Sequence, residues 1–434
     1  MKRKITEKLI GWKNKEGRMP LIINGARQVG KTYSALSFGR DCYNSTAYFN
    51  LEDSAELASI FERDLDPERI IKELEAFSAQ RILPEETLVI FDEIQTAERA
   101  LTSLKYFCEK APSYHIVAAG SLLGVALNRS KYSFPVGKVE MLNLYPMDFE
   151  EFLWALGREA LAKSIRASFA DFAPFSLHDT AMDAFRKYIV VGGMPKAVAE
   201  YADKGDFNYV TAVQKSLANA YVADMAKYAS PQETTRILAA WSSVPGQLAK
   251  ENHKFQYKMI KSGARSSEYD TPLAWLEAAG IVYRCTRVTQ GALPLMAYAD
   301  NSYFKIYLAD TGILCSKFGI SPNIIMEMPH AFDQFKGALI ENYVMQGLIV
   351  NEISPFYWNP DNRSEVDFVF QNRLGQVIPI EVKSSDNVRS RSLSNYCARY
   401  GPPYAIRLSP KNFGFENTIK SLPLYALFCL DVLR

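Results

Sequence analysis

The sequence predicts an α/β protein whose N-terminal part is a parallel sheet covered by helices on both faces. Short apolar runs alternate there with helical patterns, which is typical of βαβ units. A glycine-rich segment lies between one such run and a helix, and another run ends in two acidic residues. Open parallel sheets bind ligands where their strands end, so these segments predict one binding site at one edge of the sheet.

The glycine-rich segment spans residues 25–32 and reads GARQVGKT. It fits the phosphate-binding pattern G-x-x-x-x-G-K-[ST], with a predicted strand over residues 20–24 and a predicted helix over residues 33–38. Glycines let the backbone curl so that successive N–H groups point at one anion, next to the positive end of the helix dipole. We therefore expect a nucleotide here; an ordinary glycine turn followed by a lysine is the alternative. The residues expected to contact the nucleotide are Gly25, Ala26, Arg27, Gln28, Val29, Gly30, Lys31, Thr32 and Tyr33.

Hydrolysis of a nucleotide also requires a magnesium ion and a carboxylate near it. Lys31 would reach the β- and γ-phosphates, and the hydroxyl of Thr32 would bind Mg²⁺. Residues 88–91 predict a buried strand that Asp92 and Glu93 follow directly. Asp92 would hold Mg²⁺ or its waters, and Glu93 would orient and polarise the attacking water. A strand that ends in a solvated acidic turn is the alternative for this segment alone.

Further segments continue the same alternation. Ser121 ends one predicted strand and would lie beside Asp92, where a polar side chain can sense the γ-phosphate. A Gly-Ser turn is also common for purely structural reasons. The remaining predicted strands cover residues 46–51 and 114–119, and the predicted helices cover residues 55–63 and 69–77.

Taken together, the motifs GARQVGKT, LVIFDEIQ, AAGSLLG and LNLYPMDFEEFL, followed by VGGMP at residues 191–195, resemble one protein family. It is the AAA-type ATPases of bacteria and archaea that carry a C-terminal domain of unknown function. The resemblance covers nearly the whole chain and implies ATP as the nucleotide. It also implies that Asp92 and Glu93 are the Walker B pair and that Ser121 is the first sensor.

The arginine finger that neutralises transition-state charge is not placed by these motifs. Arg129 follows the sensor and is one candidate; an arginine that only solvates a loop is the alternative. Without a finger in the same chain, hydrolysis should be slow until a protein partner or a second subunit supplies one.

The middle of the chain predicts helices, with a turn at Gly192-Gly193 before Pro195. A predicted helix over residues 271–279 and predicted strands over 281–288 and 304–308 look like a winged-helix module, which the family resemblance also implies. Such modules often bind DNA. The candidate phosphate contacts are Lys254, Lys258, Lys261 and Arg265. A solvated helix face, or a module that binds protein, is the alternative. The other predicted helices cover residues 149–156, 181–190, 215–228 and 231–241.

The C-terminal part predicts strands over residues 356–358, 365–370 and 377–383, the last two joined by a turn. Strand alternation lets Asp367, Glu381 and Lys383 converge on one side of the sheet.

Two carboxylates and a lysine can hold Mg²⁺ and an attacking water, as a metal-dependent phosphodiesterase requires. The pattern resembles the restriction-endonuclease-like fold, whose signature is D…E-x-K. Glu341 lies on an apolar helical stripe with Met345 and Leu348, and would face inward and join the site. A simple cross-strand charge pattern is the alternative, and so is a nuclease-like domain that only binds.

Composition sets the remaining bounds. The chain of 434 residues is 48% hydrophobic and 23% charged, as globular proteins are, and its net charge of +2 neither requires nor excludes nucleic acid. No run is long enough to span a membrane, no secretory signal is visible, and the cysteines are scattered. We therefore expect a cytoplasmic protein with free thiols and no membrane partner. The predicted domains are a P-loop core (1–150), a helical lid or connector (151–225), a winged-helix-like domain (226–325) and a restriction-endonuclease-like domain (326–434).

Three functions fit these expectations. The first is an ATPase switch, in which Mg²⁺-dependent ATP turnover is coupled to a C-terminal half that binds nucleic acid or protein. The second is an ATP-regulated nuclease that uses Asp367, Glu381 and Lys383. The third is a non-enzymatic interaction module with ATP as a structural ligand.

Overall fold

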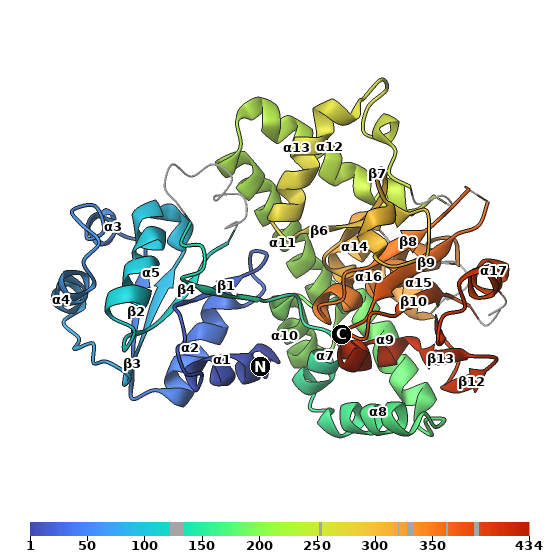
Figure 1. The fold of residues 1–434 in the computed structure, drawn as a ribbon, viewed down its shortest axis with the longest axis horizontal. Helices are drawn as coiled ribbons and strands as arrows, with labels where there is room; N and C mark the ends of the chain where they lie inside the picture. The colour runs from blue at the N-terminus through green and yellow to red at the C-terminus, as the bar shows by residue number, and fades with distance from the viewer. Residues whose placement is uncertain are drawn as a thin grey trace. The chain divides into compact units, whose positions relative to one another are not determined.

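The computed structural model describes residues 1–121, 134–250, 254–319, 321–327, 333–361, 363–385 and 390–433. It divides into two compact units. The N-terminal unit comprises Lys2–Tyr145 and Ala278–Gly280, and the second unit comprises Met1, Pro146–Glu277 and Ile281–Arg434. Figure 1 shows the N-terminal unit in blue to teal and most of the second unit in green to red.

A parallel sheet of five strands forms the centre of the N-terminal unit, in the order β2-β3-β4-β1-β5. All of its pairings are parallel, which confirms the predicted sheet. Because β4 lies between β1 and β3, the segments that follow these two strands flank the end of β4. The strands are β1 (Leu21–Asn24), β2 (Ser45–Asn50), β3 (Thr87–Asp92), β4 (His115–Ala119) and β5 (Glu140–Asn143).

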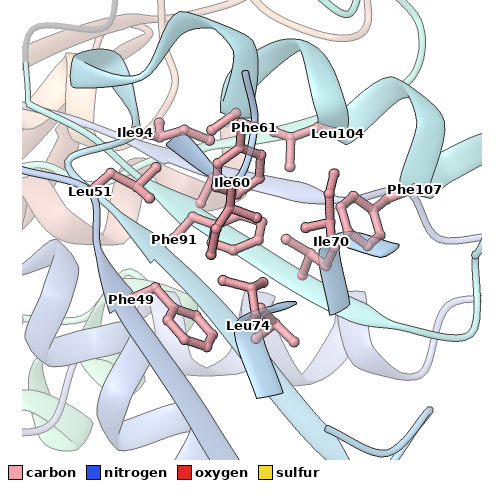
Figure 2. Packing of buried hydrophobic residues seen from close by; sticks show 14 of the residues in the cluster. Phe49, Leu51, Ile60, Phe61, Ile70, Leu74, Phe91, Ile94, Leu104 and Phe107 are labelled. Carbon is pink, nitrogen blue, oxygen red and sulfur yellow. The ribbon is translucent and has the colours of Figure 1, made fainter. Parts of the chain in front are cut away.

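Helices cover both faces of this sheet (Figure 1). On one face, Phe91 of β3 packs in an apolar cluster, where its ring centroid lies 5.5 Å from that of Phe61 and 6.4 Å from that of Phe107 (Figure 2). On the other face, α2 contacts β2, β3 and β4, and the ring of Trp12 from α1 packs against Phe38. The helices are α1 (Ile5–Lys13), α2 (Lys31–Cys42), α3 (Ala55–Ser59), α4 (Pro67–Ser78) and α5 (Glu98–Lys110), with a 3-10 turn η1 (Ile94–Thr96).

The second unit begins with helices, and the four predicted over residues 149–241 are confirmed. Capping boxes begin two of them, with Asp148 and Ser230 as the caps. The α-helices are α7 (Phe149–Ala155), α8 (Glu159–Asp171), α9 (His178–Val191), α10 (Pro195–Lys204), α11 (Phe207–Tyr228), α12 (Pro231–Leu248), α13 (Ser266–Ala278), α14 (Thr311–Phe318), α15 (Pro322–Glu327), α16 (Asp333–Val350) and α17 (Arg391–Tyr400). The 3-10 segments are η2 (Tyr257–Met259), η3 (Leu295–Tyr298) and η5 (Leu424–Leu433).

A mixed sheet of eight strands completes this unit, in the order β12-β13-β11-β10-β9-β8-β6-β7. The predicted hairpin is present, since β9 and β10 pair antiparallel. Helix α16 packs against β7 and β10, and α17 packs against β9 and β10. The strands are β6 (Val282–Val288), β7 (Ala299–Leu308), β8 (Phe356–Trp358), β9 (Val366–Gln371), β10 (Val377–Val382), β11 (Ala405–Ser409), β12 (Gly414–Glu416) and β13 (Ile419–Pro423).

This sheet corrects the expected wing. The predicted strand pair forms β6 and β7, but β6 also pairs in parallel with β8. The pair is therefore one end of the large sheet, which continues across the predicted boundary between residues 325 and 326. A strand's free edge offers unpaired N–H and C=O groups to any other strand, and a local sequence pattern does not show which distant strand will take them.

The glycine turn of the VGGMP segment has a structural cause. Gly192 has φ +75°, and a Cβ there would lie 2.4 Å from Oδ1 of Asp310. A Cβ on Gly193 would lie 2.0 Å from the carbonyl oxygen of Met147. Asp310 is buried and accepts hydrogen bonds from the N–H groups of Gly193 (2.6 Å) and Ile313 (2.8 Å). Burial raises the pKa of Asp310 to about 6, against the opposing effect of these N–H donors. Only glycine fits so tight a turn around a buried carboxylate.

No disulfide joins the cysteines of the described residues, of which Cys285, Cys315 and Cys429 are buried. Within the described ranges, no helix has the length and apolar character needed to cross a membrane.

Candidate nucleotide site and a second acidic cluster

The loop after β1 adopts the curled form that the glycine pattern predicts. Gly25 has φ +154°, and a Cβ there would lie 2.1 Å from the carbonyl oxygen of Leu144. Gly30 has φ +98° and immediately precedes α2. Gln28 also has a positive φ, +64°. The loop thus ends at the N-terminus of α2, where helix N–H groups without intrahelical partners favour an anion.

Two other loop residues are fixed by their surroundings. Val29 is fully buried, and its carbonyl oxygen accepts a hydrogen bond from Nη1 of Arg3 (2.8 Å). The same guanidinium donates through Nη2 to the carbonyl oxygen of Tyr145 (2.7 Å). Arg3 lies far from the motif in sequence, and nothing in the pattern predicted that it braces the loop. Tyr33, by contrast, is exposed.

Lys31 joins the loop to the end of β4. Its side chain is buried, and Nζ donates to the carbonyl oxygens of Gly25 and Ala26 at 2.9 Å each. Nζ also donates to Oγ of Ser121 at 3.1 Å. The structure therefore brings together the lysine and the serine that the sequence assigned to one site.

Thr32 and Asp92 meet at the same edge of the sheet. Oγ1 of Thr32 donates to Oδ2 of Asp92 at 2.7 Å, and Asp92 is 4% exposed. The hydroxyl of Tyr48, from β2, donates to the same oxygen at 2.8 Å, while the N–H of Glu93 donates to Oδ1 at 3.0 Å. A hydroxyl and a carboxylate side by side are hard oxygen ligands, so this pair fits Mg²⁺ together with phosphate oxygens.

Tyr48 was not predicted as a site residue. Burial raises its pKa, and the hydrogen bond to Asp92 adds to that effect, so the phenol stays protonated and remains a donor. No sequence motif marks Tyr48, because the local pattern predicts it only as one residue of a strand.

Glu93 is the first residue after β3, and the chain changes direction there. Its backbone lies in the left-handed region, with φ 48° and ψ 40°. Its Oε2 accepts a hydrogen bond from Nε2 of Gln95, which also was not predicted. Arg129, the candidate arginine finger, lies outside the described residues.

A second acidic cluster lies in the C-terminal sheet. Asp367 precedes Phe368, which pairs with Ile380, so it lies next to Glu381 across the β9–β10 ladder. Oδ2 of Asp367 accepts a hydrogen bond from the N–H of Val382 at 2.7 Å. Burial raises the pKa of Asp367 well above its usual range, and the charges of Glu381 and Glu341 raise it further.

The predicted lysine of this cluster is Lys383, which directly follows β10. Its Nζ donates to Oε1 of Glu381 at 2.7 Å, and Glu381 is buried. Glu341 is also buried, as its helical stripe predicted. The structure thus gathers all four predicted residues, with Glu341 acting on Asp367 through its charge.

Lys305 belongs to this cluster although no sequence motif predicts it. It lies in β7, is 1% exposed, and donates to Oε1 of Glu341 at 2.9 Å and to Oε1 of Glu365 at 2.8 Å. The hydroxyl of Tyr307 also donates to Oε1 of Glu341. The only sign of it in the sequence is a lysine inside the otherwise apolar strand FKIYL, a strand that the local pattern predicts as part of a separate wing.

Among the described residues, neither cluster offers a metal three acidic, histidine or cysteine ligands. Over the described ranges, no three such side chains are arranged to hold a metal ion. The Asp92 site can reach a full set with oxygens of a nucleotide.

The candidate DNA contacts lie between α12 and α13. Lys258, Lys261 and Arg265 are exposed, and they belong to a 3-10 turn and the loop after it rather than to a helix. Nζ of Lys254 lies 3.3 Å from the centroid of the Tyr303 ring.

Three segments of the chain match family models. Residues 17–153 match an AAA domain, residues 182–323 match a domain of unknown function (DUF8612), and residues 336–427 match another (DUF4143). A search of curated proteins found no match.

Solved structures with a similar chain trace share little sequence with this protein. The Walker-type ATPase PABY2304 of Pyrococcus abyssi is 14% identical, with a TM-score of 0.45 over 73% of this chain and 95% of that one. The ORC2 protein of Aeropyrum pernix, solved as ADPNP–ADP complexes, is 14% identical, with a TM-score of 0.37 over 76% and 95%. The ORC1 protein of Aeropyrum pernix, solved with DNA, is 13% identical, with a TM-score of 0.31 over 76% and 92%.

Proposed function

We propose, from the premise that residues 17–153 are an AAA-type P-loop ATPase domain, that this chain is an ATPase switch. In this proposal, Mg²⁺-dependent ATP turnover controls what its C-terminal half binds. The observation that carries the proposal is the contact between Thr32 and Asp92, 2.7 Å from Oγ1 to Oδ2, in the site that also holds Lys31 and Ser121.

Each residue of the site has a part in hydrolysis. Thr32 and Asp92 would hold the magnesium ion of Mg-ATP, which when bound withdraws charge from the β- and γ-phosphates. Lys31 would exchange its hydrogen bonds to loop carbonyls for bonds to phosphate oxygens, and Ser121 would contact the γ-phosphate from the end of β4. Glu93 would accept a hydrogen bond from the attacking water and so orient it.

The arginine that stabilises transition-state charge would come from a protein partner or from a second copy of the chain. Turnover by the isolated monomer should then be slow, on the order of 10⁻² per second or less. A purified monomer with many turnovers per second would contradict this part of the proposal.

Duplex DNA is the partner that we would test first. Lys258, Lys261 and Arg265 are exposed within one short stretch, and exposed cations in such a stretch can bind phosphates of any sequence. The alternative is a switch whose C-terminal half binds a protein instead of DNA.

The test is phosphate release by the full chain with Mg²⁺-ATP, with and without duplex DNA. Lys31→Ala controls for a contaminating ATPase, and a triple variant, Lys258→Ala/Lys261→Ala/Arg265→Ala, controls for the DNA contact. Turnover that DNA raises, and that the triple variant no longer raises, supports a DNA-coupled switch. Turnover indifferent to DNA favours a protein partner. Tight ATP binding without turnover, whether DNA or a protein partner is present, would contradict the proposed ATPase activity. It would favour ATP as a structural ligand.

A further inference from the structure

The turn that follows β3 holds Glu93 at both its backbone and its side chain. Glu93 lies in the left-handed region, with φ 48° and ψ 40°, which residues other than glycine rarely adopt. Its carbonyl oxygen accepts hydrogen bonds from the N–H of Thr96 (3.0 Å) and from Oγ1 of the same residue (2.8 Å). Its carboxylate accepts a hydrogen bond at Oε2 from Nε2 of Gln95. All these donors come from the single turn η1.

The orientation of the Gln95 amide follows from its partner. An ionised carboxylate can only accept hydrogen bonds, so the amide nitrogen must face Glu93 and the amide oxygen must point away from it. That oxygen, Oε1 of Gln95, is buried and has no hydrogen-bond donor among the described residues. A buried acceptor without a donor costs free energy, which the bond to Glu93 has to offset. The amide is therefore placed to suit the carboxylate, at the expense of its own oxygen.

We propose that Gln95 is a positioning residue of the ATPase: its amide holds Oε2 of Glu93, so that Oε1 of the same carboxylate is fixed to accept a hydrogen bond from the attacking water. This role rests on the proposed function, because it requires that Glu93 orients water. Glu93 is half-buried and the amide engages its Oε2, which leaves Oε1 to the water.

The chemistry of an amide suits this task. An amide is neutral, so it fixes the carboxylate without cancelling the negative charge that polarises the water. A lysine or an arginine in its place would form an ion pair and offset that charge. A hydrogen bond to an ionised group is also about twice as strong as one between neutral groups, so a single amide can favour one orientation of a flexible side chain.

The first test is hydrolysis of Mg²⁺-ATP in a single turnover by the full chain, with Gln95→Met compared with the parent. Methionine keeps the length of the side chain and removes the donor. The rate constant should fall about 10- to 100-fold, because a misplaced reacting group slows the chemical step. The dissociation constant of ATP should stay within about twofold, because the amide contacts Glu93 and not the loop that binds the nucleotide.

Two further variants make this result specific. Gln80→Met is the matched control, because Gln80 is also half-buried but its Nε2 donates to the backbone carbonyl oxygen of Thr46 (3.2 Å); it should change neither the rate nor the affinity. Gln95→Glu, of nearly the same size, replaces the donor by a second carboxylate and should lower the rate at least as far as Gln95→Met. It decides the matter if Gln95→Met does not fold.

A double variant shows whether Gln95 acts through Glu93. Glu93→Gln alone should lower the rate constant by about 10²-fold. Adding Gln95→Met should lower it by about twofold at most, because the carboxylate that the amide positions is already gone. Losses that multiply would overturn the inference. A Gln95→Met variant as fast as the parent would also overturn it, and a faster one would mean that the amide holds Glu93 away from the water.

The same measurements separate this inference from the proposed function. Turnover by the parent that depends on Glu93 but not on Gln95 overturns the role of Gln95 and leaves the ATPase in place. No turnover by the parent overturns both, because Glu93 then has no water to orient.

Discussion

Two buried lysines, Lys31 and Lys305, each lie in a site that the sequence predicted to hold magnesium, yet their partners differ. Lys31 donates to two backbone carbonyls and to the Ser121 hydroxyl, whereas Lys305 donates to the carboxylates of Glu341 and Glu365. Carboxylates balance a buried ammonium, whereas carbonyl and hydroxyl oxygens only solvate it. The same residue types, acid and lysine, form a candidate phosphate site in one unit and a buried ionic cluster in the other.

The largest expected effect is on the stability of the second unit. Lys305→Met leaves two carboxylates without their ammonium and should lower the free energy of unfolding by about 3–5 kcal/mol, the cost of breaking a buried ion pair. Chemical denaturation of the full chain, followed by fluorescence, measures it. Lys383→Met is the matched control, because Lys383 is 27% exposed and should lower it by about 1 kcal/mol or less. Equal losses in the two variants would mean that Lys305 has no special place in the cluster.

The second effect is on turnover in the N-terminal unit. Lys31→Ala removes the cation that would contact the β- and γ-phosphates and should lower the ATPase rate by about 10²–10³-fold. Stability should change little, because carbonyl partners can be solvated when the lysine is gone. Steady-state phosphate release and thermal melting give both readouts, with the exposed Lys72→Ala as control. A variant that loses stability but keeps its turnover would reverse the roles assigned to the two lysines.

The third effect is a pH dependence of stability that differs between the two units. Burial lowers the pKa of His115, in the N-terminal unit, from 6.5 to about 4. The unfolded chain therefore takes up a proton that the folded unit resists, and stability is lost as pH falls from about 6.5 to about 4. His115 is 4% exposed, and we expect a loss of about 3 kcal/mol at most.

In the second unit, the protonation of Asp310 has the opposite effect on stability. Its pKa is raised to about 6, so its own contribution to stability increases as pH falls through that value. Melting of the N-terminal unit at several pH values, in the wild type and in His115→Phe, measures the first slope. The variant keeps an aromatic ring next to Tyr43 and should reduce the loss of stability at low pH. An unchanged dependence of stability on pH would show that another group is responsible.

The smallest effect tests how the Asp92 carboxylate is held. Tyr48→Phe removes one donor to Oδ2 and leaves Thr32 in place. The Mg²⁺ concentration for half-maximal turnover should rise about tenfold, as is usual when a residue that orients a metal ligand is lost. A change in the maximal rate without a change in the Mg²⁺ requirement would argue against this role for Tyr48.

The N-terminal fold and the convergence of its candidate site residues could be predicted because their signals are local. A glycine loop, a lysine and a strand ending in acids lie within short segments, and a parallel sheet brings their ends to one edge. The features that could not be predicted involve residues outside these short segments. They are the hydrogen bond of Arg3 to the loop, the hydrogen bond of Tyr48 from β2 to Asp92, and the strand β5, whose sequence EMLN has no continuous apolar run.

In the second unit, the hairpin, its acids and Lys383 were predicted, but the buried Lys305 that pairs with Glu341 and Glu365 was not. Lys305 reaches Glu365 only because β6 pairs with β8, seventy residues further along the chain in the register of Thr286 and Phe356. That pairing placed β7 in the sheet and its lysine in the cluster. A motif shows which residues can form a site; it does not show which buried charge elsewhere in the chain will neutralise them.

The most direct test of this contrast is ATP turnover and ATP binding by the wild type, Glu93→Gln and Asp367→Asn, measured side by side with Mg²⁺. Glu93→Gln should still bind ATP but lose turnover by about 10²-fold or more, while Asp367→Asn should change neither. Turnover that survives in Glu93→Gln, or that is lost in Asp367→Asn, would contradict the assignment of the metal-dependent chemistry to the N-terminal unit.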